Sequence, residues 1–552
     1  MQKDLSQFIR STAFLDKVVS AEEAASWIED GMNLGMSGFT LFGEPKEFPL
    51  ALSKRGKNEN FKVNLYTGAS LGPTADQSMA EAEIINLRVP YQGNSVMRGK
   101  INKGEIYYID QHLSHTAEEV RKGTLGKIDY AIIEAAGITE EGYIIPTGSV
   151  GNSPIFVEKA ENVIIEINTT APRAYEGLHD IFVQKEQGER REIPIYTVSD
   201  RIGEIGIKVD PEKVKGIILS EQPDVPSPLF EPNEETQQIA NHLLDFLASE
   251  VAAGKLPESL APLQSGVGSV ANAVLNGMKN SQFKDLEVFS EVLQDGVFDL
   301  IDAGIVKFAA GTAFSLSKKR VDSLAEDLEK YKDKIMFRPQ EISNNPEVIR
   351  RLGVISFNTA IEVDIYGNVN STHINGTKIM NGIGGSGDFA RNAKITIFVT
   401  SSLAKDGAIS TIVPFVSHID HTEHDVDVIV TEQGYADLRG LPPVKRAEKL
   451  IEIAHPKYRP QLRAYFEEAK EKVGGQTPHI LKKSFLFPYK SNRKRNNVNG
   501  RERSNKLIFG VTSIIISEMT CIYKRIMPIK LINREKGTKN GCKIPNWQTT
   551  GS

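Results

Sequence analysis

Apolar and polar residues follow one repeated order in the first half of the chain: a helix, a short apolar strand and a glycine-containing loop. Helical patterns occupy residues 20–30 and 46–55. The strand patterns occupy 31–40, 61–70, 130–138 and 162–172. Strands that alternate with helices predict a mostly parallel sheet covered on both faces. In such sheets, ligands bind at the loops beyond the carboxyl ends of the strands.

A proline-rich segment separates this half from the next. The prolines are Pro211, Pro223, Pro226, Pro228 and Pro232. An amphipathic helix follows at 234–253, and strands and helices then alternate again. A chain of 552 residues is too long for one ordinary core. We therefore predict two α/β domains, at 1–215 and 236–487, joined by a linker at 216–235.

The stretch 353–392 combines two features that point to a binding site. Its first half alternates apolar and polar residues around Tyr366-Gly367-Asn368, which predicts two strands joined by a tight turn. Its second half places four glycines between 382 and 387. A glycine run between apolar elements lets the main chain approach a ligand closely, so we interpret it as a cradle of backbone N–H groups.

Charge is distributed unevenly. The net charge is −5, yet residues 490–552 contain 14 Lys and Arg against 3 acidic residues. We predict that 488–552 is an atypical, unstructured tail, with nucleic-acid binding as its functional alternative. The rest of the chain is acidic, so no nucleic-acid partner is expected for the body. No apolar run reaches 18 residues and no signal peptide opens the chain, which predicts a cytoplasmic protein without a membrane span.

The body of the chain has no cysteine, because Cys521 and Cys542 both lie in the basic segment. Candidate nucleophiles are therefore Ser, Asp, Glu and Lys. Neither a GxSxG elbow nor a GxxxxGK[ST] phosphate loop is present. Glu291 and Glu432 both follow strand patterns next to glycine loops, which favours a role in an active site. The turn at 266–268 opens a helix and offers N–H groups to an anion.

A histidine-rich segment at 417–425 admits two interpretations. His418, His421 and His424 recur at intervals of three among three acidic residues, which is compatible with zinc or iron. The segment has no known ligand signature, so we predict that its histidines hydrogen-bond with the acids and order a loop or a subunit interface. No metal is assigned to the protein.

Several long strings identify a family. They are QSGVGSVANAV (264–274), FSEVLQDG (289–296), residues 338–373, NGIGGSGDFARNA (381–393), residues 416–441 and AHPKYRPQL (454–462). Together with GMSGFT (35–40) and TGAS (67–70), they resemble the acetyl-CoA hydrolase/transferase family of class I CoA-transferases. Within it they are most similar to the succinyl-CoA:acetate CoA-transferases. The resemblance covers roughly 5–486.

This resemblance implies two domains of the NagB/RpiA/CoA-transferase type, a homodimer, and an active site at the domain interface. It places the nucleophile on Glu291, the oxyanion donors on the backbone N–H groups of Val267 and Gly385, and supporting polar groups on Asn344 and Glu432. The implied acyl-CoA contacts are Leu263, Gln264, Ser265, Gly266, Val267, Ile361, Asn381, Gly385 and Lys405. Coenzyme A thioesters and short carboxylic acids are then substrates, and no cofactor is required.

The implied reaction is ping-pong CoA transfer through a glutamyl-CoA thioester, for example from succinyl-CoA to acetate. Two alternatives stay open at the level of sequence. Water could resolve the same thioester, which would make the protein an acyl-CoA hydrolase. A protein that only binds acyl-CoA is the third interpretation, although Glu291 and both glycine loops argue against it.

Overall fold

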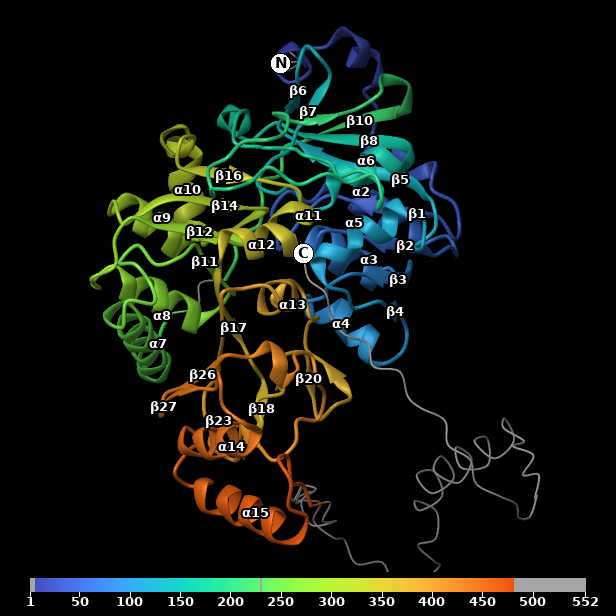
Figure 1. Cartoon of the computed structure of the whole chain (residues 1–552). Helices are drawn as coiled ribbons and strands as arrows, with labels where there is room; N and C mark the ends of the chain where they lie inside the picture. The colour runs from blue at the N-terminus through green and yellow to red at the C-terminus, as the bar shows by residue number, and fades with distance from the viewer. Residues whose placement is uncertain (1–4, 229–230, 481–552) are drawn as a thin grey trace, which may run out of the picture. The chain divides into compact units, whose positions relative to one another are not determined.

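The computed structural model describes residues 5–228 and 231–480 (Figure 1). It confirms the α/β class, with two large sheets that each come from one half of the chain. Both sheets belong to one compact unit, Met1–Ile480. The predicted boundaries at 215 and 236 stay predictions, because this unit is not divided further. The tail predicted at 488–552 lies outside the described residues.

The first sheet has seven strands, all parallel, in the order β10-β8-β5-β1-β2-β3-β4. Their bounds are β1 Asn33–Met36, β2 Val63–Tyr66, β3 Ile85–Val89, β4 Tyr107–Tyr108, β5 Ile128–Ala135, β8 Ala160–Asn168 and β10 Val214–Ser220. The helices of this half are α1 Ala21–Ser26, α2 Glu47–Gly56, α3 Ser78–Glu81, α4 Ser95–Asn102, α5 Leu113–Arg121 and α6 Ser153–Lys159. A small antiparallel sheet joins β6 Gly137–Ile138, β7 Tyr143–Ile145 and β9 Ile207–Lys208.

The central strands are apolar on both sides because both faces of the first sheet are covered. Ile132 and Ile133 are adjacent in β5 and fully buried, yet they belong to different hydrophobic clusters. Ile164 and Ile165 in β8 divide in the same way. Successive side chains on a strand point to opposite faces, so a continuous apolar run needs a core on each side.

The second sheet has eight strands in the order β16-β14-β12-β11-β17-β22-β26-β27, and only β27 runs antiparallel to its neighbour. Its strands are β11 Leu263–Ser265, β12 Leu286–Phe289, β14 Val306–Gly311, β16 Ile335–Phe337, β17 Ile355–Thr359, β22 Ile395–Val399, β26 Val428–Thr431 and β27 Gly434–Asp437. The helices are α7 Glu234–Ala252, α8 Ser269–Met278, α9 Asp295–Asp302, α10 Lys318–Asp327, α11 Gln340–Ser343, α12 Pro346–Leu352, α13 Ser386–Ala390, α14 Pro443–Glu452 and α15 Arg459–Lys472.

Shorter pairings complete this half. They are β13 Val292–Gln294 with β15 Ala313–Ser315, β18 Glu362–Asp364 with β19 Val369–Asn370 and β25 Ile412–Val413, β20 His373–Ile374 with β21 Lys378–Ile379, and β23 Leu403–Ala404 with β24 Ile409–Ser410. The predicted turn at 366–368 joins β18 to β19. Asp364 fixes it, since Oδ1 accepts the backbone N–H of Tyr366, Gly367 and Asn368, each at 3.0 Å.

Each large sheet reverses its strand order once. In the first sheet, β1 lies between β2 and β5, and later strands extend outward on both sides. In the second, β11 lies between β12 and β17 in the same relation. Such a reversal leaves a crevice at the carboxyl ends of the two central strands, where open α/β sheets bind ligands. The fold therefore predicts a site beyond the ends of β1 and β11.

Two elements of the second half are interrupted. Ser290 and Glu291 separate β12 from β13, and residues 453–458 separate α14 from α15. Among the helices of the described residues, none is long and apolar enough to cross a bilayer.

Candidate active site

A cavity of about 200 Å³ lies where the strand ends of both sheets meet. From the first sheet, it is lined by Phe39 and Thr40 after β1, Ala69 after β2 and Tyr91 after β3. From the second, it is lined by the turn at 265–267 after β11, Glu291 after β12, and Asn358 and Thr359 at the end of β17. The glycine loop at 381–386 forms another wall. Both topological reversals therefore open onto one cavity.

Glu291 reaches this cavity because the strand breaks at its position. Glu291 lies between β12 and β13, outside the hydrogen-bonded strands of the large sheet. Its carbonyl oxygen accepts hydrogen bonds from the backbone N–H groups of Thr312 and Ala313, at 2.7 and 3.1 Å. This pair of bonds fixes the main chain while the carboxylate faces the cavity. An uninterrupted strand would have paired the same residue within the sheet.

The Glu291 carboxylate has amide donors on both oxygens. Nδ2 of Asn344 donates to Oε1 at 3.3 Å, and Nε2 of Gln264 donates to Oε2 at 3.3 Å. No Lys or Arg of the described chain forms an ion pair with it. Burial raises the pKa of Glu291 to about 7, and the two amide donors only partly oppose this. The group is therefore more basic than an exposed glutamate.

Asn344 holds a second buried carboxyl group beside the first. Its Nδ2 lies 3.4 Å from Oδ2 of Asp388, and its Oδ1 accepts a hydrogen bond from Ser343 at 3.1 Å. Ser114, from the first half of the chain, donates its N–H and its hydroxyl to Asp388 at 3.0 and 2.5 Å. Burial raises the pKa of Asp388 to about 7, and the charge of Glu291 adds to this rise. Asp388 is not among the site residues predicted from the sequence, although it lies in the GSGDFAR segment at 385–391.

Gly385 brings the glycine loop against the nucleophile candidate. A Cβ at this position would lie 1.6 Å from Oε1 of Glu291 and 2.3 Å from Nδ2 of Asn344. Only glycine fits, although its φ of −87° suits any residue. Residues of the first half hold the loop: Asp110 accepts the N–H of Ile383, and the N–H of Leu113 donates to Gly384 at 3.2 Å.

The backbone N–H groups of Val267 and Gly385 are available to a ligand. Neither donates a hydrogen bond to another residue within 5–228 and 231–480, and both residues line the cavity. Gly268 follows with a φ of +133°, a conformation that favours glycine, and opens α8. Two unpaired donors from separate turns thus belong to residues that line the same cavity as Glu291, and such donors are suited to a developing oxyanion.

The other predicted residues divide into two groups. Ser265, Gly266 and Asn381 line the cavity, and Oδ1 of Asn381 is buried with no partner among the described residues. Gln264 contacts Glu291 directly. The remaining positions do not line the cavity: Leu263 is packed in the core, Ile361 precedes β18, and Lys405 is exposed in the β23–β24 hairpin. Their predicted roles stay predictions.

Glu432 also lies outside the cavity lining. Its carboxylate accepts the N–H of Ser402 at 2.8 Å and also the hydroxyl of that serine. Partial burial opposes ionisation, but these hydrogen bonds lower its pKa below the ordinary value. Its surroundings therefore differ from those of Glu291, and the matching sequence context did not reveal this difference.

The regular spacing of the three histidines in the sequence does not bring their side chains together in the structure. His418 lies 3.2 Å from Asp420, as predicted for a histidine–acid hydrogen bond. His421 is fully buried, and its Nε2 instead lies 3.3 Å from Ser371 and 3.2 Å from Ser386, which both line the cavity. His424 is exposed. The three histidines therefore do not form one cluster.

The fold and the site together define a class of enzyme in which two doubly wound sheets meet at a cavity lined by a carboxylate. Comparison with known proteins makes this specific. Residues 2–219 match the acetyl-CoA hydrolase/transferase N-terminal domain, and 321–466 match the C-terminal domain of the same family. The chain belongs to the acetyl-CoA hydrolase/transferase family. Glu291 lies between the two matched ranges.

Relatives extend this match over the intervening residues. The chain is 53% identical over 482 residues to the succinyl-CoA:acetate CoA-transferase of Clostridium kluyveri, covering 87% of this chain and 90% of the relative. It is 44% identical over 502 residues to the acetyl-CoA hydrolase of Schizosaccharomyces pombe, covering 87% and 96%. Enzymes of both names therefore share this architecture.

Solved structures support the fold. RipA from Yersinia pestis superimposes with a TM-score of 0.66 at 24% identity, covering 83% of this chain and 98% of that chain. A 4-hydroxybutyrate CoA-transferase from Porphyromonas gingivalis gives a TM-score of 0.58 at 23% identity, with 82% and 98% covered. The predicted CoA-transferase fold is confirmed.

Proposed function

We propose that this protein is a CoA-transferase that moves CoA between short carboxylic acids, with succinyl-CoA and acetate as the first pair to test. The observation that carries the proposal is the Glu291 carboxylate, which lies in a cavity between two turns with unpaired N–H groups. Membership of the family and the identity to the Clostridium kluyveri enzyme support it.

The reaction needs no group beyond this carboxylate and its donors. An oxygen of Glu291 attacks the acyl carbon of the donor, and the C–S bond breaks to give an acyl-glutamyl anhydride and the CoA thiolate. The thiolate attacks the glutamyl carbon and releases the first acid as a carboxylate. The acceptor carboxylate then repeats both steps in reverse, so the thioester is conserved and Glu291 is regenerated.

Each attack passes through a tetrahedral oxyanion. In the attack on the glutamyl carbon, the negative oxygen belongs to Glu291 itself, whose Oε1 lies beside Gly385. In the attack on the acyl carbon, the oxygen belongs to the substrate. The N–H groups of Val267 and Gly385 are the donors that we assign to these oxyanions. Asn344 and Gln264 orient the carboxylate between them.

Coenzyme A is a substrate here, and no resident cofactor is assigned. The unpaired Oδ1 of Asn381 can accept an amide N–H of pantetheine. Val267, a residue 46% exposed that lines the cavity, can cover the apolar segment of pantetheine with its side chain. Lys405 is exposed and unpaired among the described residues, so it is a candidate partner for CoA phosphates. We further propose a homodimer in the cytoplasm.

Hydrolysis is the second candidate, because the Schizosaccharomyces pombe relative carries the name of an acetyl-CoA hydrolase. The same glutamyl thioester would form, and water would replace the acceptor acid. Transferase and hydrolase therefore differ in whether water reaches the intermediate.

An acceptor-dependence assay separates the two. Purified protein is given succinyl-CoA with and without acetate, and both acetyl-CoA and free CoA are measured. We expect acetyl-CoA to form only with acetate, while free CoA stays near its background rate. Release of free CoA at the same rate without acetate would instead establish a hydrolase.

The pH dependence of transfer is the next prediction. Glu291 attacks only as a carboxylate, and its pKa of about 7 leaves it mostly protonated in mildly acidic solution. We expect kcat/KM for succinyl-CoA to fall about tenfold for each pH unit below 7 and to level off above it. An acid limb centred near 4.5, the ordinary glutamate value, would contradict the buried carboxylate described above.

A further inference from the structure

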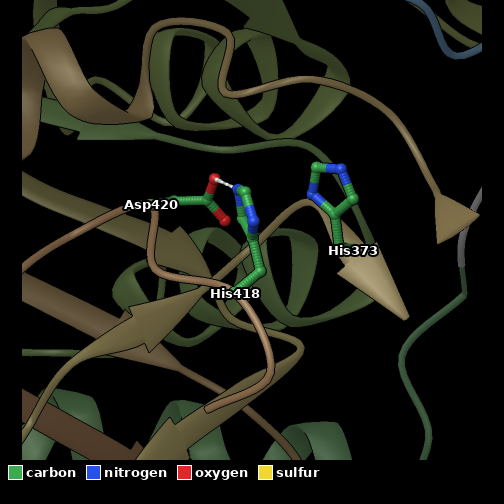
Figure 2. Close-up of side chains that lie close together, drawn as sticks. All are labelled: His373, His418 and Asp420. Atoms are coloured by element: carbon green, nitrogen blue, oxygen red, sulfur yellow. Dashed lines mark ion pairs between the residues drawn. The ribbon is translucent and has the colours of Figure 1, made fainter. Parts of the chain in front are cut away.

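Three potential metal ligands meet beside the cavity, and they come from two separate segments. His373 lies in β20, whereas His418 and Asp420 lie in the loop at 417–420. One nitrogen of each ring and one carboxylate oxygen all lie within 4.8 Å of one another. Figure 2 shows the three side chains close together, with His418 between Asp420 and His373 in this view, and the two ring centroids are 3.9 Å apart.

Each of these atoms can offer a lone pair, depending on where the imidazole protons lie. Without a metal, protons lie between them as hydrogen bonds. Nε2 of His418 lies 3.2 Å from Oδ1 of Asp420. Nδ1 of His373 lies 2.6 Å from the hydroxyl of Thr372, which is itself 2.9 Å from both Asp420 oxygens. A cation can replace the imidazole protons in this network.

We propose that His373, His418 and Asp420 form a binding site for a divalent transition-metal ion, with Zn²⁺ as the preferred occupant. Zn²⁺ bonds to nitrogen and oxygen at about 2.0–2.1 Å, so neighbouring ligands in a tetrahedral site are about 3.3 Å apart. The His418–Asp420 separation of 3.2 Å already matches this edge. Two imidazoles disfavour Mg²⁺ and Ca²⁺, which prefer oxygen ligands.

The main chain around the ligands is held by other contacts, so only the side chains have to adjust when an ion binds. The N–H of Ser371 donates to Oδ2 of Asp420 at 2.6 Å, and the N–H of Asp420 donates to the carbonyl of Val369 at 2.9 Å. Asn370 accepts the N–H of His373 at 3.0 Å and donates to its carbonyl at 2.7 Å. Such outer contacts orient metal ligands and raise affinity.

An ion can reach the site from solvent. The side chain of His418 is 39% exposed, whereas that of Asp420 is 4% exposed. Three protein ligands leave a fourth tetrahedral position for water, as in open zinc sites. The site adjoins the active-site cavity, because Ser371 both lines that cavity and donates to Asp420. It is independent of the proposed function, since none of the three ligands lines the cavity.

Zinc titration of single variants tests the proposal. Cys521 and Cys542 are the only thiols of the chain, so every protein carries Cys521→Ser and Cys542→Ser. After treatment with a chelator, the full chain is titrated with Zn²⁺ against a chromophoric chelator. The proteins compared are the parent, His373→Ala, His418→Ala, Asp420→Asn and the control His424→Ala, whose exposed histidine lies outside the cluster.

We expect the parent and His424→Ala to bind one Zn²⁺ per chain with equal affinity. Each of the three ligand variants should weaken binding at least tenfold, and circular dichroism should confirm that each stays folded. Co²⁺ should give the visible absorption of a tetrahedral complex in the parent and lose it in His418→Ala. A parent that binds no Zn²⁺ below 1 mM, or ligand variants that bind as tightly as His424→Ala, would overturn the proposal.

Discussion

Glu291→Ala is expected to reduce CoA transfer by about 10⁴-fold or more, because it removes the atom that becomes joined to CoA. The reference is Glu287→Ala, which removes a carboxylate from β12 that does not line the cavity and should retain activity. Borohydride reduction after incubation with acyl-CoA should modify the parent at Glu291 and leave the Ala variant unmodified. Undiminished turnover in Glu291→Ala would reject the mechanism.

The same carboxylate should lower the stability of the folded chain at neutral pH. A pKa raised from 4.5 to about 7 means that the folded state favours the neutral form. The stability that the folded state has while this carboxyl group is neutral is fully present below pH 4.5, and it is lost as the pH rises through 7. Glu291 is half-buried at the cavity wall, so solvent reduces the full value of about 1.4 kcal/mol per pKa unit, and the effect is about 1–2 kcal/mol.

Glu291→Gln makes this cost measurable, because glutamine has the same shape and does not ionise. Between pH 5 and pH 8, the free energy of unfolding of the parent should fall by about 1–2 kcal/mol relative to that of the variant. Urea unfolding at both pH values measures the difference. Parallel changes in the two proteins would mean that Glu291 has an ordinary pKa, and the basis for its reactivity would then be absent.

Gly385→Ala is the second variant with a large expected effect. The added methyl group would lie 1.6 Å from Oε1 of Glu291, far inside van der Waals contact, so either the carboxylate or the glycine loop must move. Displacing the loop also displaces the N–H of Gly385. Loss of one oxyanion donor costs about 10²–10³ in rate, and we expect kcat to fall by at least this factor.

Two other glycines provide the comparison. Gly99 lies in α4, away from the cavity, and a Cβ there meets no atom within 4 Å, so Gly99→Ala should retain full activity. At Gly266 the nearest atom to a Cβ is Oδ1 of Asn358 at 3.5 Å, an ordinary contact. Gly266→Ala should therefore lose less activity than Gly385→Ala. A folded Gly385→Ala protein with more than a tenth of the parent activity would contradict the predicted close approach.

Sequence motifs alone predict much of the candidate active site. Glu291 and the turn at 263–267 were found from long strings that resemble one family. Within that turn, Ser265, Gly266 and Val267 line the cavity and Gln264 contacts Glu291, whereas Leu263 does neither. Asp388 was missed because a lone carboxyl group in a short helix has no distinguishing pattern. Its importance comes from Ser114 and Asn344, which are distant in sequence.

The histidines illustrate the same limit. Their spacing indicated one possible cluster, of His418, His421 and His424, whereas folding places His373 beside His418 and turns His421 toward two serines. Sequence spacing predicts neighbours only within one regular element. Residues 417–425 form a loop with a single short 3-10 helix, so no period relates their side chains.

The sequence by itself determined the class of fold, because the alternation of apolar strands with helices permits little other than covered parallel sheets. It also determined the nucleophile candidate, through strings specific to one family. Only the tertiary structure decided that Gly385 lies against Glu291, that Asn344 joins two carboxyl groups, and that this cavity raises their pKa values. Those properties depend on distances between residues 44 to 274 positions apart, which local patterns of polarity do not encode.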